Sequence, residues 1–410
     1  MTDKSSSPDR VSSPCASARW FLIPALLLTA CAGTASGAVL QVPSQFGTIL
    51  DATIVAQVGD VIEVAPGTYT EDVSIWAGFT LRATSGPAAT FINGRVTITG
   101  SNGTLEGFTV SNPSGEAIRI ALATGANVCG NVVEASVVGV HDLLSTGSRI
   151  ENNRVSGNGN MVNGASGGVV LFSTSAAVVS GNLITGNNGP IASGISLWFD
   201  CVDTVVTNCT VVGNIGDGFM NDGENTVITN SIFWGNSTQA WGGPPQLLLQ
   251  HCIVEGGTAG AGILDTDPLL TASGQLTVAS PAIDAGVETA PGILIVVLDG
   301  EARIQCQSVD IGADEFSICE RLVRGDVNSD GVVVPIADAV FLLSYSFQQG
   351  AVPPCFEAAD VDGDGTVHGL ADSVRLLTHF FVGGPPPASP FPSCGTAPST
   401  TLGCSVGACP

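Results

Sequence analysis

The feature that most constrains this chain is a repeat in its middle. Apolar alternation followed by Gly-Asn or a similar turn recurs with a period in the twenties. Each unit offers one or two short strands, which cannot bury an apolar face alone. Stacking successive units creates a continuous apolar interior, so the period predicts a parallel β-solenoid. The aligned units start at Leu105, Val128, Ile150, Val179, Val206, Ile228 and Leu248.

Composition and turn residues agree with an all-β body. The sequence has 52 Gly and 23 Pro with only 12% charged residues, which favours strands and tight turns over helices. Asn recurs at the turns, where it tolerates left-handed backbone and can bond to its neighbour in the next turn. A leucine-rich repeat is disfavoured because its Leu signature and helical half are missing.

Residues 1–38 are typical of an export signal. Arg10 and Arg19 precede the apolar run WFLIPALLLTA, which is too short to span a bilayer comfortably, so we expect no transmembrane span. Cleavage after the small residues that end at Ala38 is favoured. The competing route is acylation of Cys31 in the lipobox-like Leu-Thr-Ala-Cys. The mature protein is therefore expected to be secreted or held at the cell surface.

The mature chain would be strongly acidic. Removing residues 1–38 leaves nine Arg, no Lys and 34 Asp and Glu, which gives a net charge of −25. Such a surface repels nucleic acid and anionic lipid, and would meet an acidic polysaccharide only through bridging cations. Calcium is the natural intermediary.

Ten cysteines would remain, an even number that favours structural disulfides over metal thiolates in an exported chain. The pairing does not follow from the sequence. Proximity alone suggests Cys306 with Cys319, Cys355 with Cys394 and Cys404 with Cys409.

The segments that flank the repeats carry a resemblance. The opening VPSQFGTILDATIVAQVGDVIEVAPGTYTEDVSI and the closing DTDPLL, SPAIDAG, LDGEARI and VDIGADEF are similar to parts of right-handed parallel β-helix proteins of the pectin-lyase-like type. The resemblance covers residues 39–318 and implies a short capping helix, then the solenoid, then a closing segment. In that segment Asp284, Asp310, Asp314 and Glu315 are expected to fix turns.

Active members of that group are often polysaccharide lyases or hydrolases, but their equipment is sparse here. The body has no Lys and lacks the polygalacturonase-like motifs, while His141 and His251 stand isolated in sequence. One alignment of the repeats pairs Gly194 with Gly216 and also Asp200 with Asp222, because the two residues of each pair have the same separation in sequence.

On stacked turns, about 4.8 Å apart, those two acids could share calcium or act as a catalytic acid and base. Trp198, Trp234 and Trp241 could offer sugar-stacking faces. The alternative is that these acids lie in solvated turns.

Two acidic loops near the C-terminus are copies of one another, the first beginning at Asp326 and the second at Asp360. Their sequences, DVNSDG and DVDGDG, place oxygen-bearing side chains at positions 1, 3 and 5 and Gly at position 6 of an EF-hand-like loop. At position 12, where an acid is expected, Ala337 and Ala371 stand instead, with Asp338 and Asp372 one place later. Either the loop is one residue longer or calcium binds more weakly. The predicted calcium residues are Asp326, Asn328, Asp330, Val332, Asp338, Asp360, Asp362, Asp364, Thr366 and Asp372.

Each loop is followed by an expected amphipathic helix. Val340, Leu343 and Phe347 form one apolar stripe, and Val374, Leu377 and Phe381 form the other, and we expect the two stripes to face each other. The duplicated loop and helix resemble dockerin type I modules, which implies calcium-coupled folding and a cohesin-like protein partner. This small α-helical module is expected over residues 319–395, with a tail at 396–410.

These observations favour an exported β-helix that presents a carbohydrate-binding or adhesive surface, attached to a partner or matrix through a calcium-binding, dockerin-like module. The alternative is a polysaccharide lyase or glycoside hydrolase that uses Asp200 and Asp222. A purely structural surface protein would bind no sugar.

Overall fold

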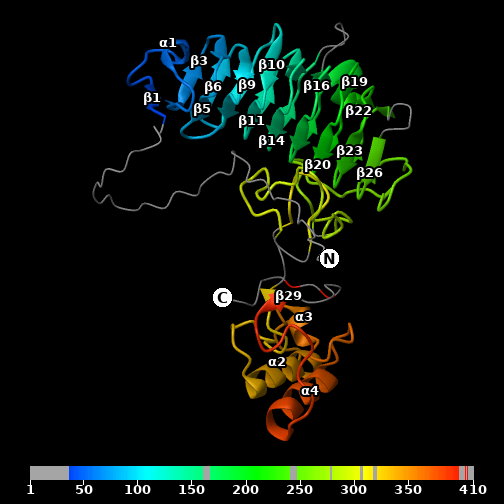
Figure 1. Ribbon diagram of the computed structural model, residues 1–410. Helices are drawn as coiled ribbons and strands as arrows, with labels where there is room; N and C mark the ends of the chain where they lie inside the picture. Colours follow the sequence, from blue (N-terminus) through cyan, green and yellow to red (C-terminus); the bar gives the residue numbers. More distant parts are fainter. Residues whose placement is uncertain are drawn as a thin grey trace, which may run out of the picture. The chain divides into compact units, whose positions relative to one another are not determined.

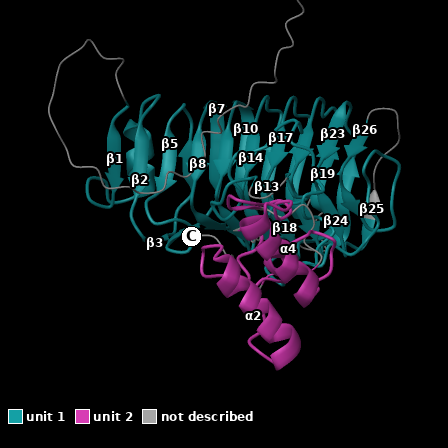
Figure 2. Cartoon of the chain, turned by 90° about the horizontal axis from the view of Figure 1, so that it is seen from below, with its two compact units in different colours: residues 1–304, 308–315 teal, residues 305–307, 316–410 magenta. Residues whose placement is uncertain are grey.

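The computed structural model describes residues 37–159, 167–240, 247–277, 279–304, 308–316, 321–396, 402 and 404. The proposed signal, apart from its last two residues, lies outside them, as do Cys31, Trp241, Cys306, Cys319 and Cys409. The strands of the N-terminal part stack in chain order (Figure 1). The chain divides into two compact units, residues 1–304 with 308–315, and residues 305–307 with 316–410 (Figure 2). No helix among the described residues is long and apolar enough to cross a membrane.

Unit 1 is a parallel β-solenoid, as the repeat predicts. Three parallel sheets run along it, and from β2 onward successive strands of the chain join different sheets, so that each turn of chain rests on the previous one. We name the ten-, nine- and eight-stranded sheets A, B and C. Sheet A consists of β1 (Val39–Val42), β2 (Val61–Val64), β5 (Thr80–Ala83), β8 (Thr104–Glu106), β11 (Asn127–Cys129), β14 (Arg149–Glu151), β17 (Val178–Ser180), β20 (Val205–Thr207), β23 (Thr226–Thr229) and β26 (Leu247–Gln250).

The other two sheets follow the same order. Sheet B consists of β3 (Gly67–Tyr69), β6 (Thr90–Asn93), β9 (Thr109–Ser111), β12 (Val132–Glu134), β15 (Arg154–Ser156), β18 (Leu183–Thr185), β21 (Thr210–Val212), β24 (Ile232–Trp234) and β27 (Ile253–Val254). Sheet C consists of β4 (Val73–Ile75), β7 (Val96–Ser101), β10 (Glu116–Thr124), β13 (Val138–Leu143), β16 (Gly167–Phe172), β19 (Asn188–Trp198), β22 (Ile215–Asn221) and β25 (Thr238–Ala240).

On sheet A, the predicted register holds for all repeats except the last. Val128 pairs with Leu105 and Ile150, and the column continues as aligned up to Ile228. Ile228 then pairs with Leu249, not with Leu248. Leu249 is buried whereas Leu248 is 48% exposed, because a one-residue shift moves a strand side chain to the opposite face. The alignment at Leu248 was therefore wrong by one residue.

Repeat length varies mainly at one corner. On sheet B, Val132 pairs with Arg154 of the next repeat, and on sheet C, Val138 pairs with Gly167. The number of residues from Val138 to Gly167 is seven larger than the number from Val132 to Arg154. The additional residues therefore enter between β15 and β16, at the corner from sheet B to sheet C. The strand pairing on both sides of that corner is unchanged.

The recurrent Asn residues divide two tasks between adjacent positions. From β8 onward, the first residue of each A-to-B turn has a positive φ, which Gly and Asn adopt most readily. The next residue points inward, where the amide of Asn131 donates to Asn153 (3.1 Å) and that of Asn153 to Asn182 (3.0 Å). The positive-φ residues are Gly107, Gly130, Asn152, Gly181, Asn208, Asn230 and His251.

A second amide ladder lies at the B-to-C corner. Each side-chain amide donates to the next over 2.9 to 3.1 Å, so the predicted bonding between neighbouring turns is confirmed. These buried amides satisfy each other inside the solenoid. The ladder runs through Asn158, Asn187, Asn214 and Asn236.

Chain that the resemblance anticipated packs against the solenoid at its first turn and along its side. The capping helix α1 spans Ile49–Val55, and the Thr48 hydroxyl accepts from the amide of Asp51 at its start. The closing segment lies along the A-to-B turns, where the side-chain amides of Asn152 and Asn208 donate to the carbonyls of Val296 and Asp310. Within it, carboxylates hold the turns as expected. Asp284 accepts from the amide of Ser308 and Asp310 from that of Asp284, while Asp314 and Glu315 accept from the amides of Leu276 and Asp310.

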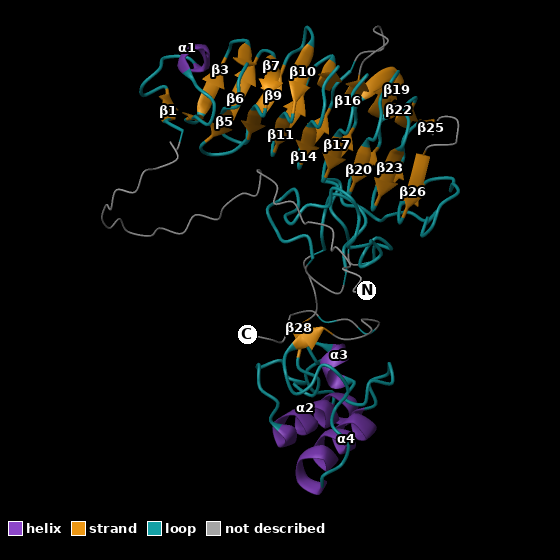
Figure 3. Cartoon of the chain, in the orientation of Figure 1, coloured by secondary structure: helices purple, strands orange, loops and turns teal. Residues whose placement is uncertain are grey.

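The regular secondary structure of unit 2 is mostly helical, with loops between the helices (Figure 3). It contains α2 (Pro335–Gln348), α3 (Phe356–Ala359) and α4 (Gly369–Val382), with a short antiparallel pair of β28 (Arg321–Leu322) and β29 (Gly395–Thr396). The two long helices begin directly after the acidic loops. The helices are therefore where the sequence placed them.

The apolar stripes assigned to these helices were on the wrong face. Leu342 and Leu376 are fully buried, and each lies one residue before a member of the predicted stripe. Val340, Phe347, Val374 and Phe381 are 58%, 68%, 53% and 63% exposed. The true inner positions include the small residues Ala339 and Ser373, which a search for large apolar side chains passes over.

Cysteine pairing also differs from expectation. Cys355 is bonded to Cys404, so the suggested pairs Cys355–Cys394 and Cys404–Cys409 were wrong. Cys129 and Cys394 each take part in a disulfide as well. Cys201, Cys209 and Cys252 are free and buried, and burial raises the pKa of the Cys209 and Cys252 thiols to about 11 and about 12. Cys209 takes the place of an Asn in the first ladder, accepting from the Asn182 amide.

Candidate functional site

The first acidic loop is folded around the carboxylate of Asp326. Its Oδ1 accepts from the amide of Asp330 (3.1 Å), and its Oδ2 accepts from that of Gly331 (2.9 Å). Gly331 has φ 90°, a conformation that Gly adopts without a Cβ penalty. The sharp turn expected at position 6 is therefore present.

The second loop repeats this arrangement. Asp360 Oδ1 accepts from the amide of Asp364 (3.2 Å), and Oδ2 from that of Gly365 (3.1 Å). Gly365 has φ 85°. The duplication seen in the sequence is thus a duplication of hydrogen bonds.

The displaced acids Asp338 and Asp372 lie in the first turn of α2 and α4. Asp338 accepts from the amides of Val327 (2.9 Å), Asn328 (3.3 Å) and Val334 (2.8 Å). Asp372 accepts from the three equivalent amides. Each acid therefore reaches back from its helix to the beginning of its loop, as a loop one residue longer would require.

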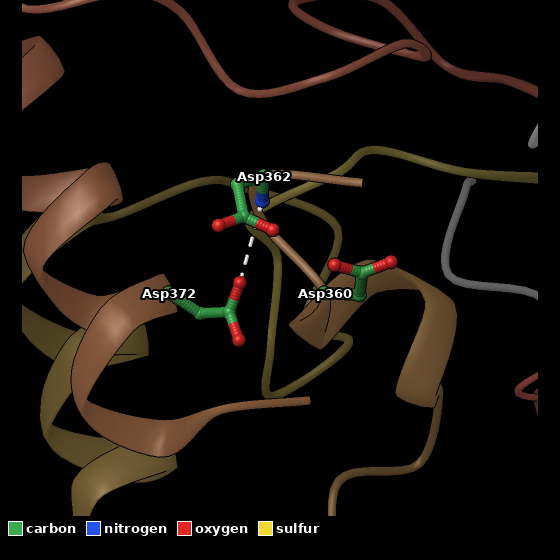
Figure 4. A group of neighbouring side chains, drawn as sticks. All are labelled: Asp360, Asp362 and Asp372. Carbon is green, nitrogen blue, oxygen red and sulfur yellow. Dashed lines mark hydrogen bonds between the residues drawn. The ribbon is translucent and has the colours of Figure 1, made fainter. Parts of the chain in front are cut away.

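The second loop brings three carboxylates together. One oxygen from each of Asp360, Asp362 and Asp372 lies within 4.8 Å of the others (Figure 4). In the first loop Asn328 occupies the position of Asp362, so an amide oxygen replaces the third carboxylate there. Both loops thus present oxygen donors, the ligands that hard cations such as Ca²⁺ prefer.

Electrostatics favour a cation at these loops. Burial raises the pKa of Asp338 and of Asp372 to about 6, and the neighbouring Asp362 carboxylate adds to the effect at Asp372. The buried guanidinium of Arg324 lies 3.4 Å from Asp360 and 3.3 Å from Glu357. One Arg balances only part of this buried negative charge, so the residues present fit a divalent cation.

The remaining predicted ligands occupy the outer part of each loop. Asp330 accepts from the amide of Val332 (3.0 Å), and Asp364 from that of Thr366 (2.8 Å). These short bonds shape the loop at positions 5 to 7. Their role as calcium ligands stays a prediction.

On the solenoid, the alignment that led to Asp200 and Asp222 fails within the strands. Ile195 of β19 pairs with Phe219 of β22, two positions beyond the partner that the alignment assigned, so the predicted pairing of Gly194 with Gly216 was wrong. The amide of Asp222 donates to the carbonyl of Leu197 (3.0 Å), which places Asp222 beside Trp198. Asp200 and Asp222 are both exposed in turns. A shared cation or acid–base pair stays a prediction.

Two of the three tryptophans lie on outer faces of the sheets. Trp198 is partly exposed at the end of β19, opposite Phe172 of β16 and 6.4 Å from the ring of Phe199. Trp234 lines a cleft of about 490 Å³ between sheet B and segment 267–274. Arg154 and Asp267 also line this cleft, and Arg154 donates to the carbonyl of Ser273 (3.4 Å).

Sequence inspection missed one group of polar residues. His141 was considered isolated, yet its Nδ1 lies 2.6 Å from the carboxylate of Glu116. The two residues are distant in sequence and meet because β10 and β13 are neighbours in sheet C. The signal was available only once the register of these two strands was known.

Comparison with known proteins agrees with the architecture. Residues 94–266 match the family model described as "Right handed beta helix region", so this part of the chain is a right-handed β-helix repeat region. No curated protein matches the chain.

Several solved structures are similar to parts of this chain at low identity. Geobacillus virus E2 ORF18 is 13% identical, with 55% of this chain and 59% of that chain covered and a TM-score of 0.39. The Dettilon tailspike protein (gp208) is 15% identical, with 48% and 47% covered and a TM-score of 0.34. Pectate lyase Pel9A is 14% identical, with 65% and 90% covered and a TM-score of 0.38. The chain thus spans about half the length of the first two.

Proposed function

We propose that this protein is an exported, carbohydrate-binding β-helix whose C-terminal unit binds two calcium ions and attaches the solenoid to a partner or matrix. The observation that carries the proposal is the duplicated loop, in which equivalent carboxylates accept equivalent backbone amides. Asp360, Asp362 and Asp372 would hold one ion, with help from Asp364 and Thr366. Asp326, Asn328, Asp330, Val332 and Asp338 would hold the other. Bound calcium would supply the positive charge that these buried acids lack.

A surface on the two long helices supports attachment to a protein. Ile336, Val340 and Phe347 on α2, and Leu370, Val374 and Phe381 on α4, are each more than half exposed. Exposed apolar side chains in such number typically mark an interaction site. The dockerin resemblance makes a cohesin-like partner our proposal. Export through residues 1–38, with acylation of Cys31 as the alternative anchor, belongs to the same proposal.

Calcium binding is tested by titrating the chelator-treated full-length protein with Ca²⁺ in a calorimeter. We expect two sites. Asp364→Asn should weaken one of them, while its side-chain oxygen can still accept from the Thr366 amide. Glu288→Gln, which changes an exposed acid of unit 1, is the matched control and should change nothing. Absence of calcium binding in the unmodified protein would refute the proposal.

The carbohydrate role is supported by the cleft at Trp234 and the aromatic residues at Trp198. A polysaccharide panel should reveal binding that Trp234→Ala or Trp198→Ala reduces. Binding that survives both changes would reject these two surfaces. Binding to no polysaccharide would favour a structural role for the solenoid.

A second candidate function is polysaccharide cleavage, favoured by the exposed acids Asp200 and Asp222 near Trp198. New reducing ends or unsaturated products should then form, and Asp200→Asn or Asp222→Asn should abolish them without affecting folding. Turnover unchanged in both variants would exclude this assignment.

A further inference from the structure

The guanidinium of Arg324 lies against the second acidic loop, although Arg324 itself precedes the first. Its side chain is only 3% exposed. Nη1 donates to the backbone carbonyl of Asp360 and lies 3.4 Å from Asp360 Oδ2, the oxygen that also accepts from the Gly365 amide. A positive charge of the chain is therefore fixed at position 1 of the second loop.

The two loops differ in this counter-charge. The ion pairs among the described residues include none of the acids of the first loop, Asp326, Asp330 and Asp338. The loop that Arg324 contacts is also the one with an additional carboxylate, because Asp362 stands there in place of Asn328. Arg324 thus offsets part of the repulsion among the three carboxylates that meet in the second loop (Figure 4).

Glu357 of α3 holds Arg324 from the other side. Its carboxylate lies 3.3 Å from Arg324 Nη2, and its backbone carbonyl accepts from Nη1 (2.9 Å). The carbonyl of Ser389 accepts from Nε (2.9 Å). A planar guanidinium with several fixed partners has little freedom to turn. Glu357 therefore shares the charge of Arg324 with Asp360 and fixes the direction from which Arg324 meets the loop.

The same Glu357 connects to the C-terminal segment. Its second oxygen accepts from the amide of Leu402 (3.0 Å). Two residues later, Cys404 is bonded to Cys355, the residue that caps the start of α3. A continuous series of contacts thus runs from the disulfide through Leu402, Glu357 and Arg324 to the second loop.

We propose that Glu357 and Arg324 are positioning residues of the second calcium site, and that they connect this site, but not the first, to the C-terminal segment closed by the Cys355–Cys404 disulfide. Glu357 draws the guanidinium away from full pairing with Asp360, which leaves the Asp360 carboxylate available for the cation. The inference rests on the proposed calcium function and makes unequal two sites that are near copies in sequence.

The test isolates each site in the full-length, chelator-treated protein. Asp330→Asn weakens the first site and leaves the second to be titrated with Ca²⁺ in a calorimeter, and Asp364→Asn does the reverse. Glu357→Gln removes the carboxylate but keeps the shape of the side chain. We expect it to raise the calcium dissociation constant about tenfold in the Asp330→Asn protein and less than about twofold in the Asp364→Asn protein. Glu288→Gln, the same change at an exposed acid of unit 1, should alter neither.

Cys404→Ser provides a second variant that leaves Glu357 in place. Release of the C-terminal segment should weaken the second site about threefold, with the first unchanged, because Glu357 loses the support that fixes it. Far-ultraviolet circular dichroism in calcium verifies that unit 2 is folded in each variant. Equal weakening of both sites would assign Glu357 a general structural role, and no weakening would remove its role altogether; either result overturns the inference while calcium binding stands. Absence of calcium binding in the unmodified protein would overturn the proposed function itself.

Discussion

The two units bury polar groups in opposite ways. The solenoid buries neutral amides such as Asn158 and Asn187, which donate to one another from turn to turn. Unit 2 buries carboxylates such as Asp338 and Asp372, which accept from backbone amides and have little opposite charge nearby. Neutral ladders are complete within the protein, whereas buried carboxylates need a cation. We therefore expect unit 2 to depend on bound cations more strongly than unit 1 does.

The sharpest test of that difference is calcium withdrawal, which should have the largest effect. At calcium concentrations a thousandfold above the dissociation constant, binding to the folded state alone adds about 4 kcal/mol per site to the free energy of unfolding. Calorimetry of the full-length protein should show one transition that moves with calcium and one that does not. Two transitions that move together would remove the distinction between the units.

Truncating the core of unit 2 should come next. Leu342→Ala removes a fully buried side chain and should lower the free energy of unfolding by about 3 kcal/mol. Val340→Ala, at a position that is 58% exposed, should cost less than about 1 kcal/mol. Denaturant unfolding of both variants measures the difference. Equal losses would restore the helix face that the sequence suggested.

Asp142 is the exception within the solenoid. In sheet C, Asp142 pairs with Ile120 on one neighbouring strand and with Leu171 on the other. Burial raises the pKa of the Asp142 carboxyl to about 6. The folded state holds this proton more tightly than the unfolded state, so the free energy of unfolding should fall by up to about 3 kcal/mol as the pH rises from about 4 to above 6.

Asp142→Asn should remove that slope and make unit 1 more stable at pH 8. Unfolding of the solenoid transition at pH 4, 6 and 8 provides the measurement. An unchanged slope in the variant would assign the pH dependence to another group.

The smallest effect concerns the ladder. Asn187→Ala leaves the amide of Asn158 without its acceptor and should cost about 2 kcal/mol. Asn225→Gly, at an exposed residue with φ 54°, is the control and should change stability by only a few tenths of a kcal/mol. Both are measured by the solenoid transition in denaturant. Similar costs would mean that turn conformation, not the ladder, makes Asn necessary.

Sequence was sufficient for the elements whose signal is periodic. The repeat predicted the solenoid and nearly all of its register, and the duplicated loops predicted the carboxylates that meet at Asp360 and Asp372. Both signals are local, because each depends on spacing within one copy and on the existence of a second copy. A turn such as Asn152-Asn153 shows two roles in one dipeptide, although only the structure tells which Asn performs which.

The failures arose where one residue of shift reverses the result. Leu248 and Leu249 are both leucines, so composition could not choose the buried one. On α2, the presence of Ala339 beside Leu342 on the inner face concealed the direction of the stripe. Glu116 and His141 meet because β10 and β13 pair, although one full turn of the solenoid separates these strands in sequence. No local sequence pattern indicates that pairing.

The corner between sheets B and C has a consequence for how such a protein can be modified. The step from Val138 to Gly167 is longer than that from Val132 to Arg154, yet the pairing of the adjacent strands is intact. New peptide sequence inserted between β12 and β13, the same corner one turn earlier, should therefore be displayed outside the stack without a change of register. Loops at this corner can therefore be lengthened while the three sheets of the solenoid keep their strand pairing.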